Sequence, residues 1–327
     1  MEEACIVMKK LQILMSTYNG KAYLREQLDS ILQQDCKQKG LAQLHLLIRD
    51  DGSRDGTQKI LQEYAVRYPQ KVQWFQGENC GVIQSFFELM KKTQKADYYA
   101  FSDQDDFWMP DKMGSAVQVI EKYGKNSPFL YCCRPKLVDA ELNAIPSAIK
   151  RPAMRPSFGN ALLENIVTGC TAVMNEELRA LIAFEFPRFT VMHDRWFYLT
   201  ASCFGRVYYD ETPHICYRQH GGNVVGANSG RWKEFCERLR LFWGKRHDIS
   251  RQAEEFIRIF GTLPEREDLK KCKGDVKVLS RLKLAGELAE GRKDFSRRLR
   301  LVKRKKLFRQ RRTDDFIFRM LLLMGIY

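Results

Sequence analysis

Residues 101–108 read Phe101-Ser102-Asp103-Gln104-Asp105-Asp106-Phe107-Trp108 and place three carboxylates within four positions. The apolar residues from Ala96 to Phe101 predict a short buried strand, so the carboxylates follow its C-terminal end, where open α/β sheets bind ligands. Like charges this close repel one another unless a cation or a ligand's donors offset them. The stretch therefore favours a divalent metal held by oxygen ligands, with Mg²⁺ or Mn²⁺ as candidates. The alternative is an acidic turn that caps a helix beginning near Pro110.

Two other predicted strands also end in polar turns. One is His45-Leu46-Leu47-Ile48-Arg49, which runs into Asp50-Asp51-Gly52-Ser53, and the other is Leu11 to Met15, which runs into Ser16-Thr17-Tyr18-Asn19-Gly20. A helical pattern of apolar residues follows each turn. Alternating strands and helices predict an α/β fold, with a Rossmann-like, mostly parallel sheet flanked by helices. The three turns are therefore expected to converge at one edge of the sheet.

Several segments, taken together, resemble the inverting family 2 glycosyltransferases, which have the GT-A fold. The matching segments are Ser16-Thr17-Tyr18-Asn19, Asp50-Asp51-Gly52-Ser53-Arg54-Asp55-Gly56-Thr57, Asn79-Cys80-Gly81, Ser102-Asp103-Gln104-Asp105-Asp106, Met109-Pro110-Asp111-Lys112 and His193-Asp194. Their order and spacing extend over roughly residues 10 to 225. Within the family, the chain looks most similar to bacterial rhamnosyltransferase-type members. The resemblance implies a nucleotide-sugar donor, a divalent cation and direct displacement at the anomeric carbon.

The resemblance also implies a nucleoside pocket. Thr17, Tyr18 and Asn19 would line it, with Tyr18 against the base; a half-buried aromatic at a strand end is the structural alternative for Tyr18. Asp51 corresponds to the carboxylate that accepts the pyrimidine N3–H, a charge-assisted hydrogen bond. Asp50 is expected to be structural. Because thymidine and uridine share the N3–H, the donor is expected to be linked to TDP or UDP.

The acidic stretch matches the D-x-D motif of the family. In that motif Asp103 reaches the ribose or metal-bound water and Asp105 binds the metal, with Asp106 orienting them. His220 is a further candidate metal ligand, in Arg218-Gln219-His220-Gly221-Gly222-Asn223, where His220 or Arg218 would reach the diphosphate or complete the metal shell. The alternative for His220 is a hydrogen bond within a glycine turn.

Inverting transfer needs a base that takes the proton of the acceptor hydroxyl. The family places this base at the start of a helix, which corresponds to Asp194 in Met192-His193-Asp194-Arg195-Trp196. The alternative is that Asp194 only caps that helix or supplies an acid to its first turn.

Composition narrows the class of protein. The 327 residues, 44% of them hydrophobic, suffice for one large domain and a smaller region. No apolar run is long enough to span a bilayer and the N-terminus lacks the pattern of a signal peptide, so neither is predicted. Ten cysteines without a C-x-x-C pair are expected to be reduced thiols of a cytoplasmic protein.

Positive charge is concentrated in the last third of the chain. Residues 231–327 hold 28 Lys and Arg against 14 Asp and Glu, whereas residues 1–230 hold 27 against 26. The last third has helical patterns, a basic run from Arg297 to Lys306 and the apolar segment Phe316 to Met324. This combination suits peripheral contact with an anionic membrane. The resemblance to bacterial family members implies the inner face of the bacterial plasma membrane. The alternatives are a solvated helix face and packing of the apolar segment on the catalytic domain or on a partner subunit.

We therefore expect a GT-A catalytic domain over residues 1–228 and a basic helical region over residues 229–327. The expected enzyme is a metal-dependent inverting hexosyltransferase, with rhamnose favoured, that acts in the synthesis of cell-surface polysaccharide or a polyprenyl-diphosphate-linked glycan. Another hexosyltransferase, for glucose or galactose, is an alternative. A second alternative is an inactive scaffold that binds membrane or nucleic acid through the basic region, but the chain lacks a recognisable nucleic-acid-binding motif.

Overall fold

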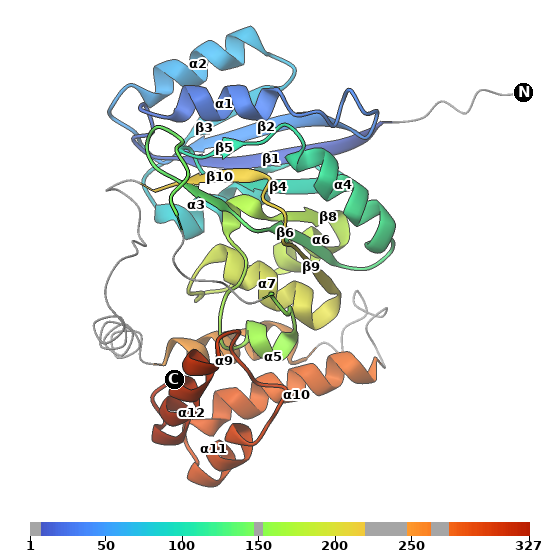
Figure 1. Ribbon diagram of the computed structural model, residues 1–327, viewed down its shortest axis with the longest axis vertical. Coiled ribbons are helices and arrows are strands. Elements are labelled where there is room, and N and C mark those ends of the chain that lie inside the picture. Colours follow the sequence, from blue (N-terminus) through green and yellow to red (C-terminus); the bar gives the residue numbers. More distant parts are fainter. Residues whose placement is uncertain (1–7, 147–152, 220–246, 263–274) are drawn as a thin grey trace, which may run out of the picture. The chain divides into compact units, whose positions relative to one another are not determined.

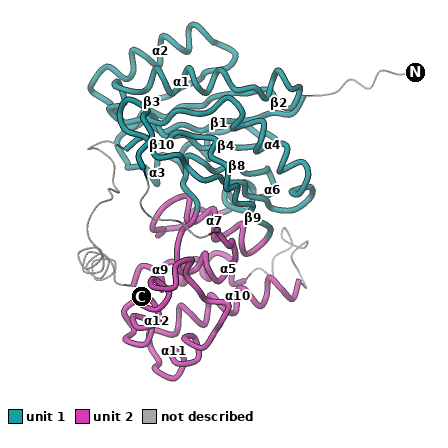
Figure 2. The backbone as a smooth tube through the Cα atoms, viewed as in Figure 1, with its two compact units in different colours: residues 1–148, 167–184, 205–220 teal, residues 149–166, 185–204, 221–327 magenta. Residues whose placement is uncertain are grey.

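The computed structural model describes residues 8–146, 153–219, 247–262 and 275–327 (Figure 1). The chain forms two compact units, which Figure 2 colours separately. The first unit comprises residues 1–148, 167–184 and 205–220, and the second comprises residues 149–166, 185–204 and 221–327. The expected domain boundary between residues 228 and 229 lies outside the described residues.

Within the described residues, the main sheet of the first unit has seven strands in the order β3-β2-β1-β4-β8-β6-β9. Neighbouring strands are parallel except at β8, which is antiparallel to both β4 and β6. This confirms the mostly parallel sheet. The strands are β1 (Lys9–Thr17), β2 (Ala42–Asp50), β3 (Val72–Gln76), β4 (Tyr98–Ser102), β6 (Phe129–Cys133), β8 (Val173–Asn175) and β9 (Arg206–Asp210).

A small three-stranded sheet lies in the same unit, in the order β5-β10-β7. Its central strand, β10 (Ile215–Arg218), is antiparallel to β5 (Phe107–Trp108) and parallel to β7 (Lys136–Val138). Because β5 follows the acidic turn directly, the pairing of β5 with β10 fixes one end of that turn.

Helices cover both faces of the main sheet (Figure 1). On one face, the alternating side chains Leu11, Ile13 and Met15 of β1 join a buried cluster with apolar residues of α1 and α2. On the other face, the ring of Phe86 in α3 contacts Phe101 edge-on, with centroids 5.8 Å apart. The helical segments of this unit are α1 (Leu24–Leu32), α2 (Thr57–Arg67), α3 (Gly81–Lys92), α4 (Lys112–Tyr123), the 3₁₀ turn η1 (Gly169–Thr171) and α6 (Glu176–Phe184).

The second unit is helical. Its described helices are α5 (Phe158–Ala161), α7 (His193–Phe204), α9 (Asp248–Phe260), α10 (Val276–Gly291), α11 (Phe295–Val302) and α12 (Arg312–Met324). All twelve residues of α7 are buried. Aromatic contacts join α7 to α9. The ring centroids of Trp196 and Phe256 are 5.6 Å apart, and those of Phe204 and Phe260 are 5.0 Å apart. The helical character expected for the last third is therefore confirmed in its described parts.

Among the helices that the structure describes, none is both long enough and apolar enough to cross a membrane.

Candidate active site

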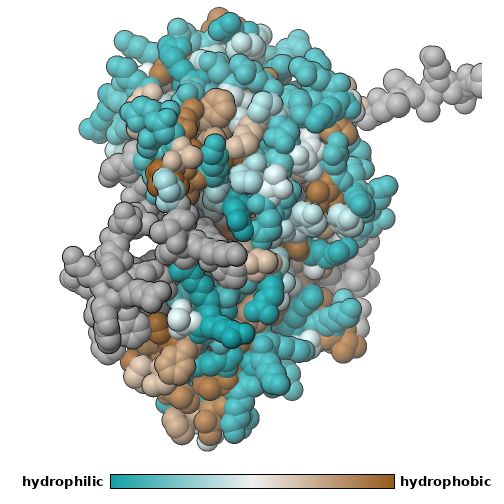
Figure 3. All heavy atoms as spheres, in the orientation of Figure 1, coloured by the Kyte–Doolittle hydropathy of each residue, from teal (hydrophilic) through white to brown (hydrophobic). Residues whose placement is uncertain are grey.

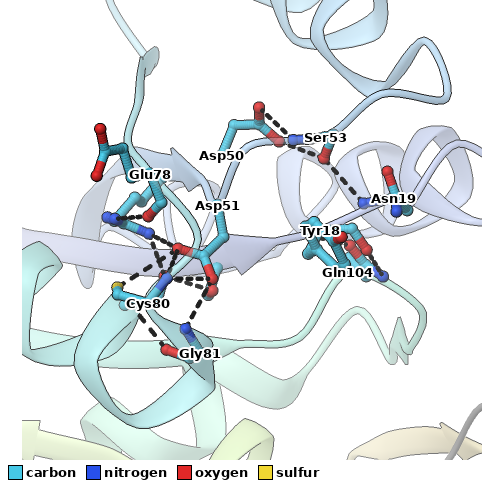
Figure 4. A network of polar contacts seen from close by, with 12 residues as sticks. Tyr18, Asn19, Asp50, Asp51, Ser53, Glu78, Cys80, Gly81 and Gln104 are labelled. Atoms are coloured by element: carbon cyan, nitrogen blue, oxygen red, sulfur yellow. Dashed lines mark hydrogen bonds and ion pairs between the residues drawn. The ribbon is translucent and has the colours of Figure 1, made fainter.

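The turn after β1 is attached to the acidic turn by one side chain, Gln104. Its Oε1 accepts hydrogen bonds from Thr17 Oγ1, at 2.6 Å, and from the backbone N–H of Tyr18, at 2.7 Å. Its Nε2 donates back to the Tyr18 carbonyl at 3.0 Å. Thr17 is buried, but the Tyr18 side chain remains 48% exposed and is available to a ligand (Figure 4).

The same turn is attached to the loop that follows β2. The backbone N–H of Asn19 donates to Ser53 Oγ at 2.8 Å, and Asn19 Oδ1 accepts from the backbone N–H of Arg54 at 2.9 Å. Asn19 has a φ of 49°, in the left-handed region, where asparagine is among the more tolerated residues. The three turns therefore converge at the carboxyl edge of β1, β2 and β4, as the sequence predicts.

Asp50 stabilises the loop after β2. Its carboxylate is fully buried and accepts hydrogen bonds from Ser53 Oγ, from the Ser53 backbone N–H at 3.1 Å and from Gln58 Nε2 at 2.8 Å. These contacts hold the loop that carries Asp51, which is a structural role.

Asp51 connects β2 to the start of α3 (Figure 4). Its carboxylate pairs with the Arg49 guanidinium and accepts the backbone N–H groups of Cys80, at 3.2 Å, and Gly81, at 3.0 Å. Burial alone would raise the pKa of Asp51, but the hydrogen bonds from Arg49 and Cys80 outweigh it and the pKa is lowered. Asp51 is therefore an ionised carboxylate held in one orientation, as an acceptor for a base N–H must be.

Arg49 is itself buried and gathers the surrounding polar groups. Nη1 lies 3.2 Å from Ser85 Oγ, and Nη2 donates to the Glu78 carbonyl at 2.8 Å. A Cβ on Gly77 would lie 2.3 Å from Arg49 Nη2, so glycine leaves the space that the guanidinium fills. The Cys80 thiol also contacts Asp51, at 3.4 Å, and Cys80 is exposed.

Sequence reasoning assigned no role to Arg49, Cys80 or Gln104. Arg49 and Asp51 are two residues apart at the end of a strand, a spacing that puts side chains on the same face, so their pairing had a visible signal. The contacts of Cys80 and Gln104 come from other elements and had none.

The acidic turn contains a cluster of potential metal ligands. A carboxylate oxygen of Asp103, a carboxylate oxygen of Asp106 and the Sγ atom of Cys170 all lie within 4.8 Å of one another. Asp106 is fully buried, and this burial, together with the charge of Asp105, raises its pKa to about 7. Burial raises the pKa of the Cys170 thiol well above its ordinary value, so the thiol is neutral. The cluster offers a hard cation carboxylate oxygens rather than a thiolate.

Lys112 lies beneath the acidic turn and is fully buried. Its Nζ donates to the Cys170 carbonyl at 2.7 Å and lies 3.0 Å from the centroid of the Trp108 ring. Burial lowers the pKa of Lys112 to about 7. Lys112 therefore attaches the start of α4 to η1 rather than reaching a ligand at the surface.

Arg218 differs from its expected role of reaching the diphosphate or the metal. Its guanidinium is buried: Nε donates to the Asp105 carbonyl at 2.9 Å, Nη1 to the Ala140 carbonyl, and Nη2 pairs with Glu26. The guanidinium carbon also lies 4.4 Å from the centroid of the Tyr23 ring. With its donors used inside the protein, Arg218 holds the backbone of the acidic turn in place.

Two predicted residues remain, Asp194 and His220. Asp194 belongs to the second unit, in the first turn of α7, and is 8% exposed. The loop before it is held by Gln252 of α9, whose Oε1 accepts from Thr190 Oγ1 and the Val191 N–H, each at 3.0 Å. His220 lies outside the described residues. The structure thus brings together the predicted residues Thr17, Tyr18, Asn19, Asp51, Asp103 and Asp105.

An α/β unit with polar turns gathered at the carboxyl edge of its parallel strands is typical of a nucleotide-binding enzyme. The chain belongs to glycosyl transferase family 2, whose model matches residues 12–178. It is a GT-A type glycosyltransferase, as the resemblance implied.

Two curated relatives and one solved structure illustrate the likeness. The chain is 30% identical over 229 residues to the dTDP-rhamnosyl transferase RfbG of Shigella flexneri, an alignment that covers 65% of this chain and 74% of the relative. It is 27% identical over 236 residues to the uncharacterized glycosyltransferase RT0329 of Rickettsia typhi, covering 69% of each. S. aureus TarS 1–349, solved with UDP-GlcNAc, has 17% identity and a TM-score of 0.53, covering 97% of this chain and 91% of that one. This last likeness concerns the fold.

Proposed function

We propose that this glycosyltransferase moves a hexose, rhamnose in the first instance, from a TDP- or UDP-linked donor to an acceptor hydroxyl with inversion at the anomeric carbon. The observation that carries the proposal is the convergence of Tyr18, Asp51 and the acidic turn at one sheet edge in a family 2 chain. The dTDP-rhamnosyl transferase among its relatives favours rhamnose over glucose or galactose.

The nucleoside would bind between the turns after β1 and β2. The half-exposed Tyr18 ring offers a surface for stacking of the base, and the buried Asp51 carboxylate accepts its N3–H. Thr17 and Asn19 complete the edge. The Thr17 hydroxyl is fixed by its hydrogen bond to Gln104, and Asn19 Oδ1 is fixed by the backbone N–H of Arg54. A pocket assembled before binding loses little freedom when the nucleotide enters, which favours affinity.

Mn²⁺ or Mg²⁺ suits the acidic turn, because carboxylates of Asp103 and Asp106 lie close together beside a neutral thiol. Asp103 and Asp105 would hold the ion, with His220 as a further ligand, and the buried Asp106 would orient them. When bound, the ion stabilises negative charge on the departing diphosphate. Arg218 holds the backbone of the turn at Asp105, which would keep the carboxylates in position when the donor leaves.

Asp194 would accept the proton of the acceptor hydroxyl. A carboxylate in the first turn of α7 interacts favourably with the positive end of the helix dipole, and a carboxylate is one of the groups that serve as a general base. The acceptor would be a hydroxyl of a cell-surface polysaccharide or of its polyprenyl-diphosphate-linked precursor. The place of action would then be the inner face of the bacterial plasma membrane.

Asp194→Asn tests the assignment of the base. The measured quantity is release of TDP from TDP-rhamnose with Mn²⁺, water replacing the acceptor hydroxyl. We expect the rate to fall by about 10²–10⁴-fold, because the amide cannot take the proton, while the donor Kd stays within about twofold. The matched control is Asp248→Asn, which makes the same change in the first turn of α9. An Asp194→Asn protein with the full rate would remove Asp194 as the base.

A further inference from the structure

Two neighbouring helices of the second unit expose large apolar side chains. On α11, Phe295 is 59% exposed and Leu299 42%, and on α12, Phe316, Met320 and Met324 are 67%, 47% and 53% exposed. Within each helix these residues are four positions apart, so they share one side of it. Apolar side chains gather in Figure 3 in the region that Figure 1 labels α11 and α12. We refer to these five residues as the α11–α12 apolar face.

In the part of the second unit that the structure describes, these five side chains are exposed rather than packed in its core. The opposite side of α12 is the one that packs, with Ile317, Phe318, Leu321 and Leu322 buried. The Phe318 ring contacts Tyr327 edge-on at 6.4 Å, and the Tyr327 hydroxyl donates to the Leu288 carbonyl at 2.8 Å. Because α12 is already attached through its buried side, the exposed apolar side remains free for an outside partner. Exposed apolar surface of this kind marks an interaction site.

Positive charge surrounds the same helices. Residues 291–312 contain twelve Lys and Arg and one acidic residue, Asp294. Some of this charge is paired within the unit, as Arg304 is with Glu287. Lys303, Lys305 and Lys306, in the exposed turn after α11, have no ion pair with any acid that the structure describes. A partner that offers negative charge as well as apolar surface would match both features.

An anionic bilayer offers both. Its phosphates attract lysines within a screening length of about 10 Å at 0.1 M salt, and its acyl chains accept Phe, Leu and Met side chains. A nucleic acid would satisfy the lysines, but its backbone gives Phe316 and Met320 no apolar contact. We propose that the α11–α12 apolar face enters the boundary between headgroups and acyl chains of an anionic bilayer, with Lys303, Lys305 and Lys306 at the phosphates.

This proposal deepens the membrane location given under Proposed function, but its test needs neither donor nor acceptor, so its failure is distinguishable from failure of the transfer chemistry. The full chain is sedimented with vesicles of phosphatidylcholine, with and without phosphatidylglycerol. We expect binding only with phosphatidylglycerol, and loss of most binding as salt rises toward ~1 M, where the screening length falls to about 3 Å.

A triple variant without the three lysine charges tests whether these lysines contribute to binding of anionic vesicles. Lys303→Gln, Lys305→Gln and Lys306→Gln together are expected to lower the partition coefficient on anionic vesicles by about tenfold or more. The matched control removes three exposed lysines of the first unit, by Lys37→Gln, Lys95→Gln and Lys125→Gln, and is expected to lower binding by less than about twofold. Equal loss in both triple variants would show a general effect of net charge and overturn the proposal.

An apolar variant tests insertion. Phe316→Ser removes a ring that is 67% exposed, and we expect a loss of about tenfold in vesicle binding with an unchanged melting temperature. Val66→Ser, at a position 70% exposed on α2, is the control and should bind as the wild type does.

Three results would overturn the proposal: no binding to anionic vesicles at low salt, full binding by the Phe316→Ser protein, or salt-sensitive binding to an oligonucleotide without binding to vesicles.

Discussion

Asp50 and Asp51 are adjacent, yet their side chains have different partners. Asp50 accepts hydrogen bonds from Ser53 and Gln58 within its own loop, whereas Asp51 contacts Arg49 and the start of α3. The structural role expected for Asp50 agrees with these contacts, and the role of Asp51 toward a base stays a prediction. Sequence reasoning missed Arg49 although its spacing from Asp51 was visible, and it could not show that Gly77 leaves the space that the buried guanidinium fills.

Loss of Arg49 should leave Asp51 as a buried charge without its cation. Arg49→Met is expected to reduce the free energy of unfolding by about 3 kcal/mol. In the double variant Arg49→Met with Asp51→Asn, the charge is gone, so the loss should be smaller than the sum of the two single losses by at least about 1 kcal/mol. Urea unfolding of the four proteins measures this coupling. Additive losses would show that the pair does not act as a unit.

His193 gives the second unit a pH dependence. Burial lowers its pKa from 6.5 to about 3, so the folded chain keeps the imidazole neutral where the unfolded chain binds a proton. Stability from this group is complete above about pH 6.5 and falls as the pH drops toward 3, by at most about 1.4 kcal/mol per pH unit.

We therefore expect wild-type stability to fall more steeply between about pH 6 and pH 4 than that of His193→Gln, which has no imidazole to protonate. Urea unfolding at several pH values compares the two slopes, and the carboxylates common to both proteins cancel in the difference. Parallel curves would mean that His193 is protonated in the folded chain.

At the scale of helices and strands, hydrophobic periodicity predicted β1, β2 and β4 and the helices after them, because long apolar patterns are bounded by polar turns. It missed the small sheet of β5, β7 and β10, whose strands have two to four residues and carry too few positions for a pattern. It also missed that β10 places Arg218 against the acidic turn, since that contact depends on tertiary pairing.

Replacement of two glycines by alanine is expected to change the stability of the chain in opposite directions. A Cβ on Gly205, just before β9, would lie 1.8 Å from the Pro128 carbonyl oxygen, so Gly205→Ala should destabilise the chain by about 2 kcal/mol or more. Gly286, inside α10, has open space at the same position, and Gly286→Ala should stabilise it by about 0.5–1 kcal/mol. Melting temperatures that move in the same direction for both variants would contradict the packing described here.

At the scale of the whole molecule, the chain passes between its two units several times. Residues 149–166 and 185–204 belong with the C-terminal helices rather than with the sheet that their neighbours in sequence form. The predicted division between residues 228 and 229 stays a prediction. Composition and linkers indicate boundaries along the chain, but they do not reveal which separate segments pack together. That Asp194 belongs to a different unit from the turns after β1, β2 and β4 had no sequence signal.

This arrangement predicts that a chain of residues 1–228 is less stable than the whole chain. Removal of α9 takes away the rings of Phe256 and Phe260 and exposes Trp196 and Phe204 of α7. We expect a chain truncated after residue 228 to bind the dye ANS, which reports exposed apolar surface, and to lose a cooperative melting transition. A truncated chain that melts cooperatively near the temperature of the full chain would contradict this expectation.

The central claim is a metal-dependent nucleotide-sugar site at the carboxyl edge of β1, β2 and β4. Its most direct test is equilibrium titration with TDP-rhamnose, UDP-glucose, UDP-galactose and GDP-mannose, each with Mn²⁺ and with a chelator. Asp105→Ala is compared with Asp97→Ala, a carboxylate that accepts the Lys10 N–H at the opposite end of β4. We predict that one pyrimidine-linked donor, TDP-rhamnose first, binds only with metal, and that Asp105→Ala weakens it by about tenfold or more while Asp97→Ala does not. Absence of binding by every donor with metal present, or equal binding by the two variants, would contradict the account.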